Sequence, residues 1–349
     1  MNCWVEFIDL KFIRPVGTSR GLLHSKPSWI LHLNNGKVTG KGEISIIQGL
    51  SPDFSDRISF EKKIEDVLSD LNGGSCHPEE GIASSLLNSL KDFPSILFGL
   101  ETAWLDFKYG GKGIYFDNAF SQGDRKIPIN GLVWMGTPEF MQEQIDQKLQ
   151  SGFTTIKMKI GAIDLKTELK ILRSIREKFS ADQLTLRVDA NGAFTNKEAT
   201  KVLEQLAELA IHSIEQPIPA GTWDDMSELC KCTPVPIALD EELIGITSRE
   251  KKTELLETIS PQYIILKPSL HGGISGTKEW IELAEARNIP WWMTSALESN
   301  IGLNAICQFT AECENPLPQG LGTGSLYENN FESNLIVKDG FILSKKIYS

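Results

Sequence analysis

The chain has 349 residues, a formal net charge of -11 and a sequence pI of about 5.1. Its hydrophobic (41%) and charged (23%) fractions are those of a folded globular protein, and no segment reaches the ~18 apolar residues of a membrane span. The acidic balance and the N-terminus, which lacks the features of a signal peptide, argue against nucleic-acid or membrane partners and favour a cytoplasmic location.

The first 125 residues predict an α+β domain. Residues 3–13 alternate as a strand does, and residues 29–33 and 42–47 resemble a hairpin. Helical patterns follow at residues 60–71 and 96–109. Within this domain, residues 14–26 form a polar stretch with three basic residues, which we interpret either as a mobile lid or as an ordinary exposed loop.

From residue 127 onward, short apolar runs alternate with helical segments. This alternation is typical of repeated βα units around a parallel sheet. Helices are predicted at residues 139–150, 165–179, 197–209 and 277–287. Strands are predicted to end near Asn130, Lys159, Asp189, Glu215, Asp240, Lys267, Ser295 and Gly322. Eight strands of this kind indicate a TIM-type barrel.

The last residues predict a hairpin. Residues 335–343 are interrupted by Lys338-Asp339-Gly340, and such a hairpin is too short to be stable alone. We therefore expect it to pair with the N-terminal domain. The predicted fold class is α/β, with a barrel at residues 126–325 and a discontinuous domain formed by residues 1–125 and 326–349.

Five ionisable residues end successive predicted strands: Lys159, Asp189, Glu215, Asp240 and Lys267. Each follows the previous one by about one βα unit, so the five should form an arc around the barrel mouth. A charge at the end of an apolar strand is costly unless it is paired or binds a metal. A single such residue is usually a helix cap or a turn residue, but five at one end of one barrel favour a functional site.

Three members of this arc are carboxylates. Asp189, Glu215 and Asp240 would repel one another unless a cation joined them. Oxygen ligands without His or Cys select Mg²⁺, with Mn²⁺ as a substitute, and disfavour zinc. Asn191 lies two residues beyond Asp189 and is expected to orient a ligand or bind the metal's shell. Lys157 and Arg187 are further candidates for supporting residues.

The remaining members are lysines. Lys157 and Lys159 point to the same face of their strand because side chains alternate with period two. Neighbouring cations, including Lys157, Lys267 and the metal, would disfavour the ammonium form of Lys159 and make it a usable base.

Five strings of sequence resemble the muconate-lactonising-enzyme subgroup of the enolase superfamily in order and spacing, over most of the chain. They are KMK (157–159), RVDANG (187–192), SIEQP (213–217), ALDE (238–241) and LKP (266–268). The resemblance implies a capping domain from both chain ends over a modified (β/α)7β barrel. It also implies Asp189, Glu215 and Asp240 as metal ligands, and Lys159 and Lys267 as an acid/base pair that acts on a proton α to a carboxylate of a small molecule.

Within that subgroup, the string TSALESNIGL (294–303) resembles the o-succinylbenzoate synthases of menaquinone biosynthesis. This implies a metal-dependent syn-dehydration of 2-succinyl-6-hydroxy-2,4-cyclohexadiene-1-carboxylate to 2-succinylbenzoate through an enediolate. Lys159 would remove the α-proton and then protonate the departing hydroxyl on the same face. Lys267 would stay cationic and stabilise the intermediate.

Two alternatives stay open. A dipeptide epimerase or N-acylamino-acid racemase could use the same scaffold, but dipeptide epimerases of the subgroup typically carry Asp-x-Asp at the eighth strand, where this chain reads GLGTGS (320–325). N-acyl substrates, which lack an ammonium group, remain compatible. A catalytically idle barrel that only binds is the other alternative, although the chain has all five residues of the arc.

The succinyl chain of such a substrate would need its own contacts. Strand-end position favours Ser295, Gly272 and Gly273 for this role, and Arg20 is a further candidate from the stretch at residues 14–26.

Overall fold

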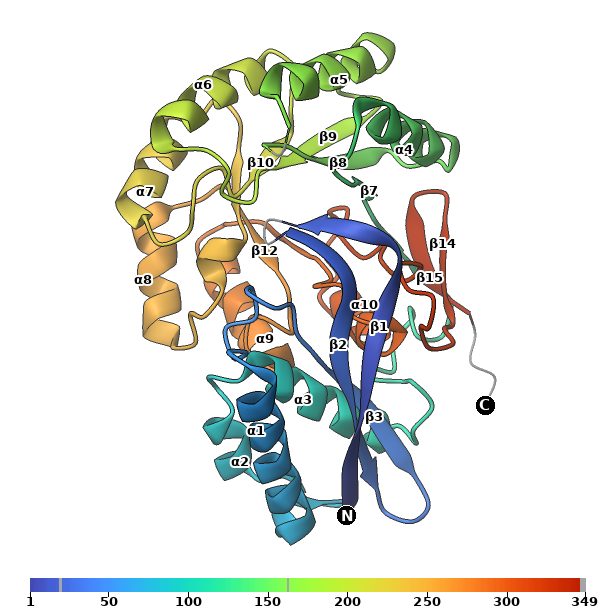
Figure 1. Ribbon diagram of the computed structural model, residues 1–349. Helices are drawn as coiled ribbons and strands as arrows, with labels where there is room; N and C mark the ends of the chain where they lie inside the picture. Colours follow the sequence, from blue (N-terminus) through green and yellow to red (C-terminus); the bar gives the residue numbers. More distant parts are fainter. Residues whose placement is uncertain (19–20, 162, 346–349) are drawn as a thin grey trace.

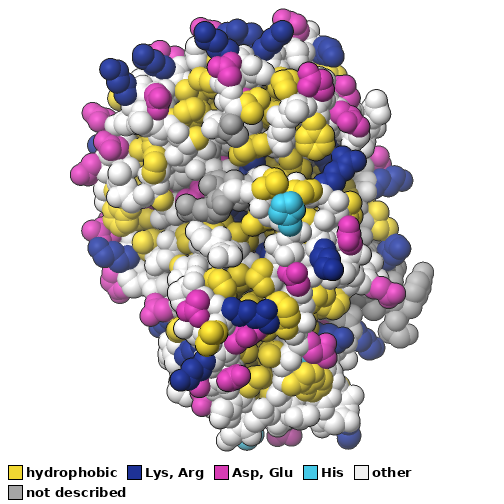
Figure 2. Space-filling view, viewed as in Figure 1, with side chains coloured by type: hydrophobic (Ala, Val, Ile, Leu, Met, Phe, Trp, Pro, Cys, Tyr) yellow, Lys and Arg dark blue, Asp and Glu magenta, His cyan; other side chains and the backbone are white. Residues whose placement is uncertain are grey.

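The structure, a computed structural model, describes residues 1–18, 21–161 and 163–345. Figure 1 shows two parts. One consists of strands with a curved row of helices around them, and the other is a smaller sheet with its own helices, from which a long hairpin reaches the strands of the first part. In the space-filling view of Figure 2, side chains of both charges are interspersed over the face shown. None of the helices in the described ranges is long and apolar enough to cross a membrane.

The N-terminal part is an antiparallel sheet covered by helices. Its strands are β1 (Asn2–Thr18), β2 (Gly21–Asn34) and β3 (Thr39–Ser45), and its helices are α1 (Arg57–Asp70), α2 (Ser84–Ser89) and α3 (Pro94–Lys108), with the short β4 (Cys76–His77) and β5 (Gly81–Ile82) between them. Helix α3 packs closely on β3. A Cβ at Gly42 would lie 2.0 Å from the carbonyl oxygen of Gly99, so glycine is needed for this approach.

Residues 14–26 are largely an extension of the β1–β2 hairpin. Val16 and Gly17 pair with Leu23 and Leu22, after an irregularity in the register that follows Lys11. The extension forms because apolar residues of β1, including Val16, pack in a cluster that also contains barrel-mouth residues of the segment after β13 (Trp291–Met293). The described residues of this segment are thus strand rather than irregular loop, and Arg20 lies outside the described residues.

The barrel strands form one parallel sheet. In spatial order they are β13 (Trp291–Met293), β12 (Tyr263–Leu266), β11 (Ile237–Leu239), β10 (Ser213–Glu215), β9 (Thr185–Asp189), β8 (Thr155–Lys159) and β7 (Gly131–Val133). The helices are α4 (Pro138–Gln150), α5 (Leu165–Lys178), α6 (Asn196–Ala207), α7 (Trp223–Cys232), α8 (Arg249–Ile259), α9 (Gly273–Glu285) and α10 (Asn300–Glu312). The expected α/β class and modified barrel are confirmed.

The eighth strand is reduced to two bridges. Gln319 bridges Ile129 and Gly320 bridges Thr294, so the segment links the two edges of the sheet and closes the barrel. Pro316 and Pro318 lack the N–H groups that a longer ladder would need. The expected strand near Gly322 is therefore shorter than the sequence pattern suggested.

The C-terminal hairpin pairs with the first strand of the barrel region. Strands β14 (Leu335–Lys338) and β15 (Phe341–Ser344) form a sheet with β6 (Lys126–Pro128) in the order β14-β15-β6. The expected pairing with the N-terminal domain is wrong for this hairpin, because Ile342 is buried against the barrel core and Phe341 lies under the ammonium of Lys126. Tyr327, earlier in the tail, does bridge Phe12 of β1.

Candidate active site

The five residues of the predicted arc lie at the carboxyl ends of neighbouring strands of the parallel sheet. Strands β8, β9 and β10 end at Lys159, Asp189 and Glu215, and Asp240 and Lys267 directly follow β11 and β12. These five strands are neighbours in the sheet. Each of the five residues is at most 9% exposed. The fold therefore brings five ionisable groups into one buried cluster, here called the arc.

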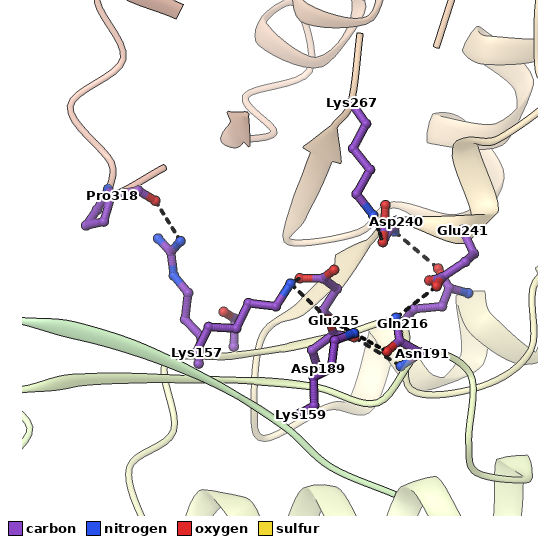
Figure 3. A network of polar contacts seen from close by, with 12 residues as sticks. Lys157, Lys159, Asp189, Asn191, Glu215, Gln216, Asp240, Glu241, Lys267 and Pro318 are labelled. Carbon is purple, nitrogen blue, oxygen red and sulfur yellow. Dashed lines mark hydrogen bonds and ion pairs between the residues drawn. The ribbon is translucent and has the colours of Figure 1, made fainter. Parts of the chain in front are cut away.

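Lysines join the carboxylates of the arc. Lys157 Nζ lies 2.9 Å from Asp189 Oδ2 and also bonds Glu215 Oε2. Lys159 Nζ lies 3.1 Å from the same oxygen of Asp189, so two ammonium groups share one acceptor. Lys267 Nζ bonds Asp240 Oδ2 at the other end of the arc. Figure 3 shows these contacts, with Lys267 reaching the site from a different strand than Lys157.

The electrostatics of the arc follow from burial and pairing. Burial raises the pKa of Glu215 to about 8, and the negative charge of Asp189 adds to this effect. Burial also disfavours ionised Asp189, but Lys157 and Lys159 outweigh it and hold the pKa of Asp189 well below its usual range. For Lys267, Asp240 similarly outweighs burial and raises the pKa of the ammonium. The arc is thus a set of ion pairs in which burial raises the pKa of both Glu215 and Asp240.

Two features of the carboxylates fit a divalent cation. Glu215 Oε1 and Asp240 Oδ1 are buried and have no hydrogen-bond partner in the described part of the chain. The donors are oxygens only, as Mg²⁺ and Mn²⁺ prefer. In the structure the lysines lie between the carboxylates. No group of three or more His, Cys, Asp or Glu residues among those described is arranged to hold an ion. An ion that used the free oxygens would take over part of the neutralisation that the lysines supply here.

The expected supporting residues take different places. Asn191 accepts a bond from Lys159 Nζ and donates to Glu241 Oε1 at 3.0 Å, so it connects the two sides of the arc. Arg187 lies deeper in the barrel. It donates to the carbonyl of Pro318 at 2.7 Å and stacks on Trp292, and burial lowers its pKa to about 10. Arg187 thus supports the barrel interior below the arc.

A cavity of about 230 Å³ lies over the arc. Its lining includes the apolar side chains Ile47 and Leu50 from the N-terminal part and Trp134, Leu297 and Leu326 from the barrel mouth. Of the arc, it includes Lys159, Asp189, Glu215 and Lys267, together with Lys157. A small, mostly apolar cavity with a few charged groups is the usual form of a small-molecule site.

The expected substrate contacts are only partly in this cavity. Ser295 lines it, whereas Gly272 and Gly273 are not among the described lining residues. Both glycines lie at the start of α9, where Glu101 of α3 accepts bonds from Ile274 N at 2.6 Å and Ser275 N at 3.2 Å. A Cβ at Gly273 would lie 2.3 Å from Glu101 Oε2. These glycines therefore serve the contact between the two parts of the molecule.

The structure adds three residues that the sequence reasoning did not assign to the site. Glu241 and Thr323 line the cavity, and Glu298 accepts a bond from Ser295. Each stands inside or next to a string that was already singled out. Glu241 follows Asp240, and an acidic residue that adjoins a proposed metal ligand is a usable signal. Nothing in the local pattern shows where Glu298 and Thr323 point.

The family model described as Enolase C-terminal domain-like matches residues 140–346. That match covers the barrel strands from β8 to β13 and all five residues of the arc. Fold and site together define a chain of the enolase superfamily, whose members are divalent-metal-dependent enzymes.

Relatives narrow the class. The chain is 45% identical to an o-succinylbenzoate synthase of Desulfotalea psychrophila, with 96% of each chain covered, and 31% identical to the L-Ala-D/L-Glu epimerase of Bacillus subtilis, with 88% and 84% covered. The crystal structure of MenC from Desulfotalea psychrophila superposes with a TM-score of 0.85 at 41% identity, covering 98% of this chain and 99% of that one. The chain belongs to the o-succinylbenzoate synthase family within the enolase superfamily.

Proposed function

We propose that this protein is an o-succinylbenzoate synthase, a carbon–oxygen lyase that dehydrates 2-succinyl-6-hydroxy-2,4-cyclohexadiene-1-carboxylate to 2-succinylbenzoate in menaquinone biosynthesis. The observation that carries the proposal is the buried arc of lysines and carboxylates at five neighbouring strand ends. The 45% identity to an o-succinylbenzoate synthase over nearly the whole chain supports it. The proposal includes a cytoplasmic location and a small carboxylate as the ligand.

Asp189, Glu215 and Asp240 would hold the divalent ion, with Mg²⁺ as our choice and Mn²⁺ as a substitute. The free oxygens of Glu215 and Asp240 are the structural support for this assignment. When bound, the ion polarises the substrate carboxylate and favours the negative charge that forms on it.

Lys159 carries the protons in this proposal. As a neutral amine it takes the proton α to the substrate carboxylate, and the electron pair of the broken C–H bond passes into the enediolate. The same lysine, now an ammonium, gives that proton to the departing hydroxyl as the C–O bond breaks, so water leaves and the ring becomes aromatic. Lys159 lines the cavity, which fits direct contact with the substrate.

Lys267 stabilises charge from the other side of the arc. Its Nζ donates to Asp240 Oδ2. Burial lowers the pKa of Lys267, but the surrounding carboxylates outweigh burial and raise it, so Lys267 is favoured as a cation. A permanent cation can stabilise the enediolate electrostatically and cannot act as a base. In this proposal only Lys159 exchanges protons with the substrate, whereas racemisation needs two lysines that exchange protons with one carbon.

The epimerase alternative has less support at the eighth-strand segment. The lining there consists of Gly320, Gly322, Thr323, Ser325 and Leu326. None of these side chains is a carboxylate that could hold a substrate ammonium, whereas a substrate without an ammonium group needs none.

The test compares substrates. The purified protein with Mg²⁺ is incubated separately with the cyclohexadiene substrate, with N-succinyl amino acids and with dipeptides, and kcat/KM is measured for each. We expect the highest value for the cyclohexadiene substrate. Faster turnover of a dipeptide would reject the synthase assignment, and turnover of no substrate would favour an idle barrel.

A further inference from the structure

A second buried polar cluster lies beside the cavity, where the N-terminal part meets the barrel. We call it the interface cluster and define it by Lys26, Glu43 and Glu298. All three side chains are at most 1% exposed. Lys26 comes from β2 and Glu43 from β3, whereas Glu298 lies between β13 and α10. The cluster therefore places charges from both parts of the molecule directly behind the cavity wall.

Glu298 accepts hydrogen bonds at both oxygens. Ser269 Oγ donates to Oε1 at 2.5 Å and Ser295 Oγ donates to Oε2 at 2.7 Å. Ser269 lies two residues after Lys267, and Ser295 lines the cavity. Glu298 thus links the segments that follow β12 and β13 and fixes the direction of the Ser295 hydroxyl.

The Ser295 hydroxyl has no capacity left for a ligand. It has one hydrogen, which goes to Glu298, and two lone pairs. Leu297 N donates to its oxygen at 3.0 Å and Thr323 Oγ1 donates at 3.0 Å. Because Ser295 has already given its hydrogen to Glu298, Thr323 must be the donor in the last contact. The Thr323 hydrogen therefore goes to Ser295, and the Ser295 hydrogen goes to Glu298.

Thr323 lines the cavity with its hydroxyl hydrogen committed to Ser295. Thr323 Oγ1 can therefore accept a hydrogen bond from a ligand but cannot donate one. A substrate carboxylate or carbonyl finds no donor there, whereas an O–H or N–H group finds an acceptor. The hydroxyl that leaves in the proposed dehydration is such a donor, and so is the amide N–H of an N-acyl amino acid.

We propose that Glu298 is a positioning residue that sets the direction of the Ser295–Thr323 hydroxyl pair, so that the cavity wall selects a substrate with an O–H or N–H donor at that point. Lys26 supports Glu298 from the N-terminal part. Its charge interacts with both carboxylates of the cluster, and its Nζ donates to Ser45 Oγ. Burial raises the pKa of Glu298, and the charge of Lys26 and the two hydroxyl donors oppose this effect and favour the ionised form that accepts from both hydroxyls.

The experiment compares two ligands that differ at the donor. The cyclohexadiene substrate carries the hydroxyl, whereas the product 2-succinylbenzoate lacks it. In Thr323→Val we expect KM for the substrate to rise about 5- to 10-fold, the loss of one hydrogen bond. The Kd for 2-succinylbenzoate should change less than about twofold, since the ligand never used that acceptor. Thr323→Ser keeps the hydroxyl and should restore KM.

The positioning residues are tested with a matched control. Glu298→Gln places a carboxamide where Ser295 and Ser269 need an acceptor, and Lys26→Met removes the cation while it keeps an unbranched chain. Both should raise KM for the substrate more than the Kd for the product. Lys252→Met is the control, because Lys252 is also 1% exposed but bonds Glu279 at 2.7 Å instead of interacting with Glu43 and Glu298.

Two results would overturn the inference. Equal weakening of substrate and product in Thr323→Val would indicate a general change of cavity shape, and an equal effect of Lys252→Met and Lys26→Met would indicate a loss of stability alone.

The substrate's identity rests on the proposed function. If the wild-type protein does not turn over the cyclohexadiene, that proposal fails, and binding of an N-succinyl amino acid is compared with its ester analogue, in which oxygen replaces N–H. The amide should bind more tightly in the wild type and lose this advantage in Thr323→Val, and equal binding in the wild type would reject the inference.

Discussion

The arc and the interface cluster are both buried groups of Lys and Glu or Asp, but they differ in how completely their oxygens are bonded. In the arc, Glu215 Oε1 and Asp240 Oδ1 have no partner among the described residues. In the interface cluster, Glu43 accepts from Ser299 N at 3.0 Å and from Gly302 N at 3.0 Å, in addition to hydroxyl donors. Buried polar atoms are normally satisfied, so the two free oxygens of the arc fit the divalent ion that we propose there.

The two clusters also differ in what they contact. Asp189, Glu215 and the lysines of the arc line the cavity. The interface cluster instead uses Glu43 to cap the N-terminus of α10, just as Glu101 caps the N-terminus of α9. A carboxylate at a helix N-terminus is favourable because it meets free N–H groups and the positive end of the helix dipole. Two carboxylates of the N-terminal part thereby anchor the helices that follow β12 and β13.

The largest expected effect is on the arc. Lys159→Ala should lower kcat for dehydration by about 10³-fold or more, because one residue performs both proton transfers. Lys159→Arg should be equally inactive, because a guanidinium keeps a positive charge but does not act as a base at neutral pH. Activity is measured by the absorbance of the aromatic product, and retention of more than about a tenth of the wild-type kcat would exclude Lys159 as the base.

The next effect concerns the interface cluster. Glu43→Gln should lower the free energy of unfolding by about 1–3 kcal/mol, since α10 loses a charged acceptor at its N-terminus. Urea titration measures this change. Glu254→Gln is the control, because Glu254 pairs with Lys251 at the surface and should cost less than about 0.5 kcal/mol. Equal effects of the two variants would contradict the distinction between buried cap and surface ion pair.

The smallest expected effect is on the free energy of unfolding when either of two glycines with positive φ is replaced by alanine. Gly273 has φ of +71° and its Cβ would meet Glu101, whereas Gly36 has φ of +87° and nothing within 4 Å of the same position. Gly36→Ala should cost about 1 kcal/mol from the backbone alone, and Gly273→Ala should cost more. Thermal or urea unfolding gives both values. A cost at Gly273 no greater than at Gly36 would show that α3 can move away from α9.

The sequence predicts the arc well because its signal is local. Apolar runs that end in Lys159, Asp189 or Glu215 recur once per βα unit, and the parallel sheet then brings the ends together. The barrel strands and most helices are recognisable for the same reason. The division of the chain into domains at residue 125 stays a prediction, as do the roles of the arc residues.

The interface cluster could not be predicted in this way. Glu43 and Ser299 are 256 residues apart in the chain, and no period connects them. The hairpin at the C-terminus was assigned to the wrong partner because pairing of short edge strands depends on which apolar face is left uncovered, and that is a property of the assembled barrel. The directions of hydroxyl groups such as Thr323 likewise depend on acceptors from distant segments.

We expect a divalent ion to bind at the arc and not at the interface cluster. Calorimetric titration of Mg²⁺ into the wild type, Asp240→Asn and Glu43→Gln tests it most directly, with thermal unfolding in the same buffers as a second readout. We expect one ion per chain for the wild type and Glu43→Gln, with a rise in Tm because the ion binds only the folded state. Asp240→Asn should neither bind nor respond. Absence of binding to the wild type, or equal binding to Asp240→Asn, would contradict the claim.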